Sequence, residues 1–260
     1  MSNGISRMIP YFQFTTIWLG PVPIYVWGLF VASGILAGAA LGAWFAKQRG
    51  LKPDVIWDLA VWITIGSFIA GRLFQVVFYE PEFYFVNPGE IIKIWHGGMS
   101  IIGGFIGAVI AGVWYLWRKK LDVVAYCDTA IFGLPLGMGI GRIGCFLIHD
   151  HPGTLTDFVL GVRYPDGVRH DLGLYESLVG FALAVVFYVL WRKKAPQGTY
   201  IAVFLIGYGA SRFFLDFLRA TDGAIVDTRY FGLTPAQYVA LAMVGFGLWS
   251  TRHLLYRSPK

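Results

Sequence analysis

Residues 125–148 read AYCDTAIFGLPLGMGIGRIGCFLI, an apolar stretch that carries an arginine, Arg142, near its far end. A run of ~20 apolar residues is what a helix needs to cross the ~30 Å hydrocarbon layer of a bilayer. A guanidinium in hydrocarbon costs at least ~2.5–3.5 kcal/mol and keeps its proton, so Arg142 requires an anionic partner or water. The stretch therefore predicts a membrane helix with a functional charge.

Similar apolar stretches recur along the 260 residues, of which 57% are hydrophobic and only 14% are charged. With a mean hydropathy of +0.61, this composition excludes an ordinary soluble domain. We expect an all-α, polytopic membrane protein that forms one domain over residues 1–260 and has no cleavable signal peptide. Its seven transmembrane helices are predicted at residues 22–46, 55–79, 99–117, 125–148, 174–191, 199–218 and 235–255.

The net charge of +6 follows the predicted topology. Lysines and arginines cluster in alternate connections, among them residues 47–52, 118–120 and 192–194. The positive-inside rule makes these connections cytoplasmic, which places the N-terminus outside and the C-terminus in the cytoplasm. The basic balance is therefore a topology signal, and we expect no nucleic-acid partner.

The outer connections are longer and offer small elements for recognition. Residues 149–173 form the largest outer loop, in which the alternation over residues 158–164 and the turn at Pro165-Asp166-Gly167 predict a hairpin. Residues 90–95, in the preceding outer connection, form an amphipathic stretch that fits the membrane interface.

Three intramembrane arginines lie at a similar depth. Arg72, Arg142 and Arg212 each fall roughly 10 Å below the outer end of their span, at ~1.5 Å per helical residue. Such charges mark functional sites in membrane proteins. Their common level predicts a pocket for an anionic group that resides in the membrane, for which a lipid phosphate is the obvious candidate.

The sixth predicted span has a polar face made of Tyr208, Arg212, Asp216 and Arg219. We interpret it as the wall of a cavity in which Asp216 orients the arginines. The alternative is a ladder of ion pairs within the helix that only eases charge into the membrane.

The fourth span presents Arg142, Cys145 and His149 on one face. Arg142 is suited to bidentate phosphate binding, and Cys145 is read as a packing residue rather than a nucleophile. For Arg72, a structural pairing with a carboxylate such as Glu176 stays open.

The outer-face histidines match no strong zinc-ligand spacing, so no metal and no cofactor is expected. They are His96, His149, His151 and His170. We interpret them as interfacial polar residues, one of which can act as a base near neutral pH.

The chain resembles the bacterial phosphatidylglycerol–prolipoprotein diacylglyceryl transferase family over nearly its whole length. Two arginine blocks in the right order are the specific part of the resemblance. The matching motifs are Val26-Trp27-Gly28-Leu29, Gly71-Arg72-Leu73, Trp95-His96-Gly97-Gly98, Gly103-Gly104, Gly141-Arg142-Ile143-Gly144, Leu174-Tyr175-Glu176 and the block from Phe204 through Tyr208, Arg212 and Asp216 to Arg219.

The resemblance implies seven spans, a place in the bacterial cytoplasmic (inner) membrane, and an active site toward the extracytoplasmic side. It implies transfer of the diacylglyceryl group of phosphatidylglycerol to the lipobox cysteine in the signal peptide of a preprolipoprotein, within the lipid bilayer. Arg142 and Arg212 become the expected catalytic residues. Since Ile102 stands where the family has its histidine, His96 or His149 is the candidate substitute base, and the alternative is that the arginines suffice without a dedicated base. The expected substrate-binding residues are Arg72, Trp27, Cys145, Tyr175, Glu176, Tyr208, Asp216, Arg219, Gly103 and Gly104.

The chain departs from the family pattern at several positions. Ile102 stands where the family has a histidine, Cys145 where it has an asparagine, and Asp216 where it has a glutamate. Trp27 occupies the place of a tyrosine. The alternatives are therefore a catalytically altered member that binds phospholipid or lipoprotein precursor, or a small membrane transporter.

Overall fold

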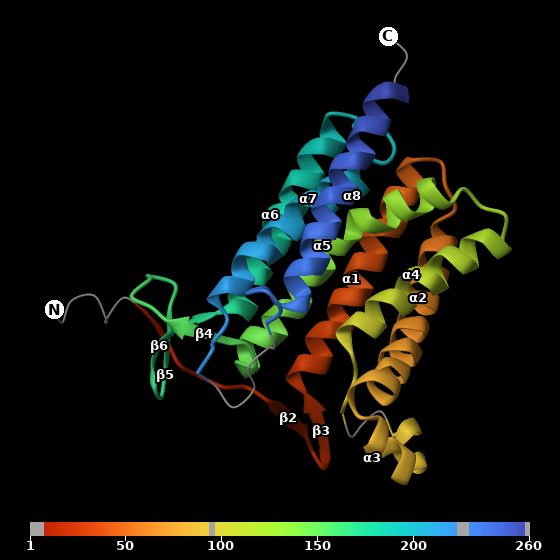
Figure 1. Ribbon diagram of the computed structural model, residues 1–260. Helices are drawn as coiled ribbons and strands as arrows, with labels where there is room; N and C mark the ends of the chain where they lie inside the picture. Colours follow the sequence, from red (N-terminus) through yellow and green to blue (C-terminus); the bar gives the residue numbers. More distant parts are fainter. Residues whose placement is uncertain (1–7, 94–96, 223–228, 258–260) are drawn as a thin grey trace. The chain divides into compact units, whose positions relative to one another are not determined.

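Figure 1 shows a computed structural model, which describes residues 8–93, 97–222 and 229–257 and is mostly helical. Helix α2 continues through a π-helical turn at Gln75–Tyr79, and α7 continues through a 3-10 turn at Asp216–Leu218. The long helices are α1 (Val26–Gln48), α2 (Pro53–Phe74), α4 (Ile101–Arg118), α5 (Val123–Ile148), α6 (Leu172–Arg192), α7 (Thr199–Leu215) and α8 (Pro235–Arg257).

Within the described residues, five helices are long and apolar enough to cross a membrane: α1, α2, α5, α6 and α7. Helix α4 is apolar but shorter, and α8 covers the seventh predicted span. Many of their large apolar side chains point outward, for example Leu36 (59% exposed), Ile110 (62%) and Val185 (62%). Apolar surface on this scale suits lipid rather than water, and the chain is a multi-pass membrane protein.

The first span begins later than the sequence predicted. Residues 22–25 were expected to be helical, but Val22–Tyr25 forms strand β3, which pairs antiparallel with β2 (Thr16–Leu19). Gly20 supplies the left-handed conformation of the turn, with φ +60°. The apolar pattern missed this hairpin because β-branched residues suit a strand and a buried helix alike.

A second sheet follows the end of α5 and leads into α6. Its strand order is β1 (Ile9–Pro10), β5 (Val162–Tyr164), β6 (Gly167–Asp171) and β4 (Pro152–Leu155). Strands β5 and β6 pair antiparallel around the turn at Gly167, which confirms the hairpin predicted for the outer loop. The connection between α2 and α4 holds α3 (Pro81–Val86) and a 3-10 turn at Pro88–Ile92, whereas residues 94 and 95 of the predicted amphipathic stretch lie outside the described residues.

Contacts within the chain group it into two compact units, one of residues 43–130 and one of residues 1–42 with 131–260. The single membrane domain expected over residues 1–260 stays a prediction. In the unit of residues 43–130, α2 packs along α4 around Ile56, Leu59 and Leu116. In the other unit, α6, α7 and α8 lie side by side (Figure 1).

Candidate active site

A buried glutamate joins two intramembrane arginines from different helices. Glu176, in the first turns of α6, is 2% exposed. Its Oε2 lies 2.7 Å from Nη2 of Arg142 on α5, and its Oε1 pairs with Nη1 of Arg212 on α7. Two of the three predicted arginines therefore meet at one carboxylate. The alternative pairing of Glu176 with Arg72, which belongs to the other compact unit, stays a prediction.

A second carboxylate, that of Asp216, pairs with Arg212 and also lies close to Arg219. It is fully buried at the end of α7, 3.1 Å from Nη2 of Arg212 and 3.9 Å from Nη1 of Arg219. Its Oδ2 also accepts a hydrogen bond from the hydroxyl of Thr234, the residue before α8. The backbone N–H of Thr234 donates to the side chain of Gln237, in the manner of a capping box. Sequence reasoning missed Thr234, although its spacing to Gln237 is a helix-start signal.

The electrostatic balance of this cluster leaves room for an anion. Three guanidinium groups face the two carboxylates of Glu176 and Asp216. The side chains of Arg142 and Arg212 remain 25% and 15% exposed. Since a guanidinium carries five N–H donors, donors remain beyond those that the carboxylates occupy. The arrangement is suited to hold one further anionic group, such as a phosphodiester.

Two more predicted residues lie beside Arg142, and a third lies on the neighbouring helix α1. Its Nη1 donates to Sγ of Cys145 across 3.7 Å, and Tyr208 is close enough for a side-chain hydrogen bond. Trp27 opens α1 beside Gly144, where an added Cβ would lie 3.3 Å from the Trp27 backbone. That glycine thus allows α1 to approach the arginine-bearing turn of α5.

Tyr175 lies one residue before Glu176 but contacts the loop between α5 and α6. Its hydroxyl lies 2.8 Å from Nδ1 of His170 and 3.4 Å from the carbonyl oxygen of Leu160. Burial lowers the pKa of His170. These contacts tie the start of α6 to the loop and add no direct contact to the arginines.

Arg72 belongs to the other unit, where backbone carbonyls satisfy it. It is 4% exposed, and it donates to the carbonyl oxygens of Ile91 (3.0 Å), Glu90 and Gly98 (both 2.6 Å). Further bonds reach Lys93 and Gly97. The guanidinium thereby binds carbonyl groups of residues 90–93 and 97–98, and its predicted role as a substrate ligand stays a prediction.

Gly103 and Gly104 lie in the same unit as Arg72 and serve close helix packing there. An added Cβ at Gly103 would lie 2.6 Å from the carbonyl oxygen of Ala70 on α2. At Gly104 it would lie 3.0 Å from Oγ of Ser67. His96, one of the two predicted bases, lies outside the described residues.

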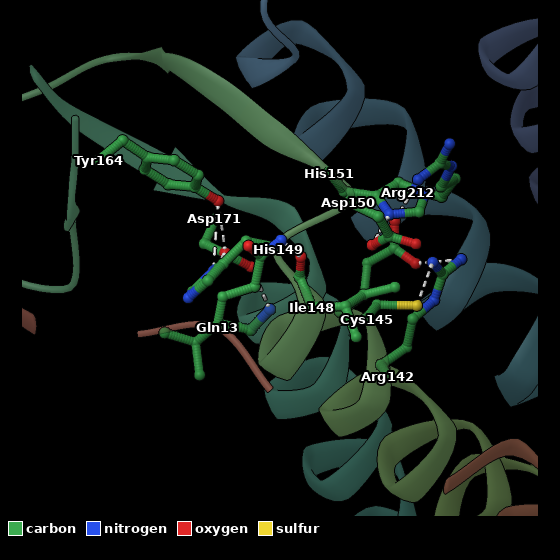
Figure 2. Close-up of polar contacts among 12 residues, drawn as sticks. Gln13, Arg142, Cys145, Ile148, His149, Asp150, His151, Tyr164, Asp171 and Arg212 are labelled. Atoms are coloured by element: carbon green, nitrogen blue, oxygen red, sulfur yellow. Dashed lines mark hydrogen bonds and ion pairs between the residues drawn. The ribbon is translucent and has the colours of Figure 1, made fainter. Parts of the chain in front are cut away.

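His149, the other predicted base, sits in an aromatic cage. Its Nδ1 is 2.7 Å from Oδ2 of Asp171, which also accepts from Tyr164 at 2.8 Å, and its ring stacks on Tyr11 at 4.8 Å. Burial raises the pKa of Tyr164 far above its usual range, reinforced by Asp171. In Figure 2, His149 points toward Tyr164 and away from Arg142. The Nε2 atom is buried and has no hydrogen-bond partner among the described residues.

Among the described residues, one group has ligand atoms close enough to hold a metal ion. The ligand atoms of Cys145, Asp150 and His151 all lie within 4.8 Å of one another. However, the guanidinium of Arg142 donates to the sulfur of Cys145, so a cation there would meet a positive charge. The electrostatics do not fit a metal centre.

Comparison with known proteins points to one family. A model of the family described as prolipoprotein diacylglyceryl transferase matches residues 15–252. Three relatives bear the name phosphatidylglycerol–prolipoprotein diacylglyceryl transferase. The one from Solidesulfovibrio magneticus is 35% identical, over 92% of this chain and 94% of its own. Those from Nitrosomonas europaea and Roseobacter denitrificans are each 33% identical, over 94% and 84% of this chain and 92% and 87% of their own.

Proposed function

The chain belongs to the prolipoprotein diacylglyceryl transferase family, and we propose that it moves the diacylglyceryl group of phosphatidylglycerol onto the cysteine thiol of a prolipoprotein. The names of the relatives support the two substrates. The single structural observation that carries the proposal is the convergence of Arg142 and Arg212 on Glu176. It supplies a fixed pair of guanidinium groups where an intramembrane phosphate would need them.

The proposed reaction is a displacement at the C3 carbon of the lipid glycerol. The thiol loses its proton, its sulfur forms a bond to C3, and the bond from C3 to the phosphate oxygen breaks. That oxygen keeps the electron pair and leaves as part of glycerol phosphate, so negative charge grows on the phosphate. Arg142 and Arg212 stabilise this charge, an effect worth ~2.7–4 kcal/mol per preorganised donor.

The remaining site residues act on these two arginines or on the substrate. Glu176 and Asp216 hold the guanidinium groups in place, so little reorganisation is needed as the charge develops. Arg219, Tyr208, Cys145 and Trp27 contact the phosphate and the lipid headgroup. The proposal also includes substrate binding by four further residues, which are Tyr175, Arg72, Gly103 and Gly104.

The topology is part of the same proposal. The chain crosses the bacterial inner membrane with seven spans, its N-terminus outside and its C-terminus in the cytoplasm, as the distribution of basic residues favours. The active site opens to the extracytoplasmic side of the bilayer, where it meets the lipobox of the signal peptide. In support, Arg142 lies near the end of α5 that leads into the sheet of the largest loop.

The test is transfer of labelled diacylglyceryl from phosphatidylglycerol to a lipobox peptide by the purified chain. Arg142→Ala and Arg212→Ala each remove a phosphate donor, and we expect each to lower the rate by at least about 100-fold. Arg192→Ala is the matched control, because this arginine ends α6 far along the helix from Glu176. Activity of Arg142→Ala and Arg212→Ala within about threefold of the wild type would reject the phosphate-binding role.

The same experiment separates the alternatives. A catalytically altered member binds labelled phosphatidylglycerol, in an arginine-dependent way, without forming the thioether. A transporter moves lipid or solute across proteoliposomes without modifying the peptide.

A further inference from the structure

The turn after α5 brings a second polar pair to the arginine cluster. Nδ1 of His151 hydrogen-bonds to Oδ1 of Asp150, and a ligand atom of each lies within 4.8 Å of Sγ of Cys145. The same sulfur is 3.7 Å from Nη1 of Arg142. Figure 2 shows Asp150 and His151 on the side of Arg212 and Cys145. A histidine other than the two predicted from the sequence therefore lies at the candidate active site.

The backbone around His151 is held from both sides. Its carbonyl oxygen accepts a hydrogen bond of 3.1 Å from the N–H of Leu172, at the start of α6. The next residue, Pro152, pairs with Asp171 in the sheet, and Gly153 forms a bridge with Arg219 beyond α7. These bonds tie the backbone of the turn to α6 and to the end of α7, and the hydrogen bond to Asp150 orients the imidazole on that backbone.

Accessibility also distinguishes the two histidines of this turn. The side chain of His151 is 21% exposed and that of Asp150 is 33% exposed. The side chain of His149 is 0% exposed and is enclosed by aromatic rings. A substrate thiol can approach His151 directly, whereas it can reach His149 only if the cage opens.

We infer that His151 accepts the proton of the incoming prolipoprotein thiol and that Asp150 is its positioning residue. The inference rests on the proposed function. A neutral imidazole is the side chain best matched to proton transfer near neutral pH. A carboxylate on Nδ1 fixes the tautomer in which Nε2 is the free acceptor, and it stabilises the imidazolium that forms.

The proton and electrons balance without a co-reactant. The thiol proton moves to Nε2 of His151, the sulfur bonds to C3 of the lipid, and the phosphate oxygen departs with the pair of the broken C–O bond. The imidazolium then releases its proton to water on its exposed side. A ligand atom of His151 lies within 4.8 Å of Sγ of Cys145 and Nη1 of Arg142 lies 3.7 Å from the same sulfur, so the proposed base and a phosphate donor share one small region.

Charged groups from each neighbouring element accompany His151. Asp150 precedes it, Arg142 and Cys145 come from α5, Arg212 and Arg219 from the end of α7, and Asp171 from β6. Asp150 hydrogen-bonds to Nδ1 of His151. Removal of its carboxylate should therefore loosen the orientation of the imidazole without touching the phosphate donors.

The decisive experiment is the pH dependence of transfer, measured with the full chain, phosphatidylglycerol and a lipobox peptide from about pH 5 to about pH 9. We expect His151→Ala to lower kcat by at least about 100-fold near neutral pH, with the KM for the lipid changed less than about threefold. The acid limb of the profile disappears, and added imidazole restores part of the rate. Asp150→Asn lowers kcat by about tenfold, whereas Asp157→Asn, an exposed carboxylate in the same loop, does not.

Each other outcome rejects either the proposed function or the inference about His151. An inactive wild type rejects the proposed function itself. An active wild type with His151→Ala within about threefold of it and an unchanged pH profile overturns this inference alone. The inference is also overturned if His151→Ala loses activity that imidazole does not restore while the acid limb of the pH profile stays in place. It is overturned as well if the acid limb disappears in His149→Asn and not in His151→Ala. Should His151→Ala fail to fold, His151→Gln preserves most of the volume and is judged by the same criteria.

Discussion

Nη2 of Arg142 lies 2.7 Å from Oε2 of Glu176, so an arginine of α5 is held by a carboxylate of α6. Neither charge is tolerable alone in hydrocarbon. Glu176 also pairs with Arg212, and the one carboxylate thereby sets the spacing of two guanidinium groups. The cluster needs three helices in register, so its geometry reports directly on their packing.

Glu176→Gln should lower both transfer activity and stability. The amide keeps the volume but removes the charge that the two arginines share, and breaking a buried ion pair costs ~3–5 kcal/mol. We expect at least about a tenfold loss of transfer and a lower Tm in detergent. Glu82→Gln, an exposed glutamate of α3, is the control and should leave both unchanged. Wild-type activity in Glu176→Gln would show that the bridge does not set the arginines.

Gly137→Ala should destabilise the contact between α1 and α5. An added Cβ at Gly137 would lie 2.6 Å from the carbonyl oxygen of Gly34, so the helices must move apart, at a cost of ~1–3 kcal/mol. The control is Gly245→Ala on α8, where a Cβ meets nothing within 4 Å. Thermal unfolding in detergent compares the two, and equal Tm values would contradict the close approach.

A lysine at position 72 should not replace the contacts that Arg72 makes. The guanidinium bonds carbonyl groups from Glu90 to Gly98, which a single ammonium cannot reach together. Each carbonyl left unpaired costs ~1–3 kcal/mol where it is buried. We expect a lower Tm and faster hydrogen exchange over residues 90–93 and 97–98. If Arg72→Lys matches the wild type in both measurements, the carbonyl contacts are not what Arg72 provides.

The hairpin of the large loop should loosen in acid. Arg169 lies 2.8 Å from Oδ2 of both Asp166 and Asp222, and its hydrogen bonds lower the pKa of the two carboxyl groups. A carboxyl whose folded pKa is depressed stabilises the fold above its unfolded pKa, and the effect is lost as pH falls through the folded value. Both groups are exposed, so the effect is local.

Hydrogen exchange of residues 162–171, corrected for intrinsic rates, measures this loosening. Protection should fall as pH drops below the ordinary aspartate pKa of ~3.9. Asp222→Asn should show reduced protection already at neutral pH and a weaker dependence on acid. A pH-independent difference between wild type and Asp222→Asn would exclude the carboxylate charge as the cause.

Local patterns in the chain predicted the helices and the hairpin at Gly167 well, because both depend on nearby residues. The first span was placed four residues early, at Val22, because apolar β-branched residues do not distinguish a strand from a helix. The common depth of Arg142 and Arg212 predicted that they meet. Spacing along a helix says nothing about which carboxylate of another helix they meet, and Glu176 was assigned to Arg72 as an alternative.

The sequence by itself determined that this chain spans a membrane and that arginines lie within its apolar segments, since hydropathy and helical period are local properties. Only the tertiary structure decided the partners. It joined Arg142 and Arg212 through Glu176 and brought His151 beside Cys145. It also enclosed the side chain of His149 in a cage of aromatic rings beside Asp171. The reason is that a buried charge pairs with whichever opposite charge the packing of separate helices brings close to it. That packing depends on several helices together and cannot be predicted from any one segment.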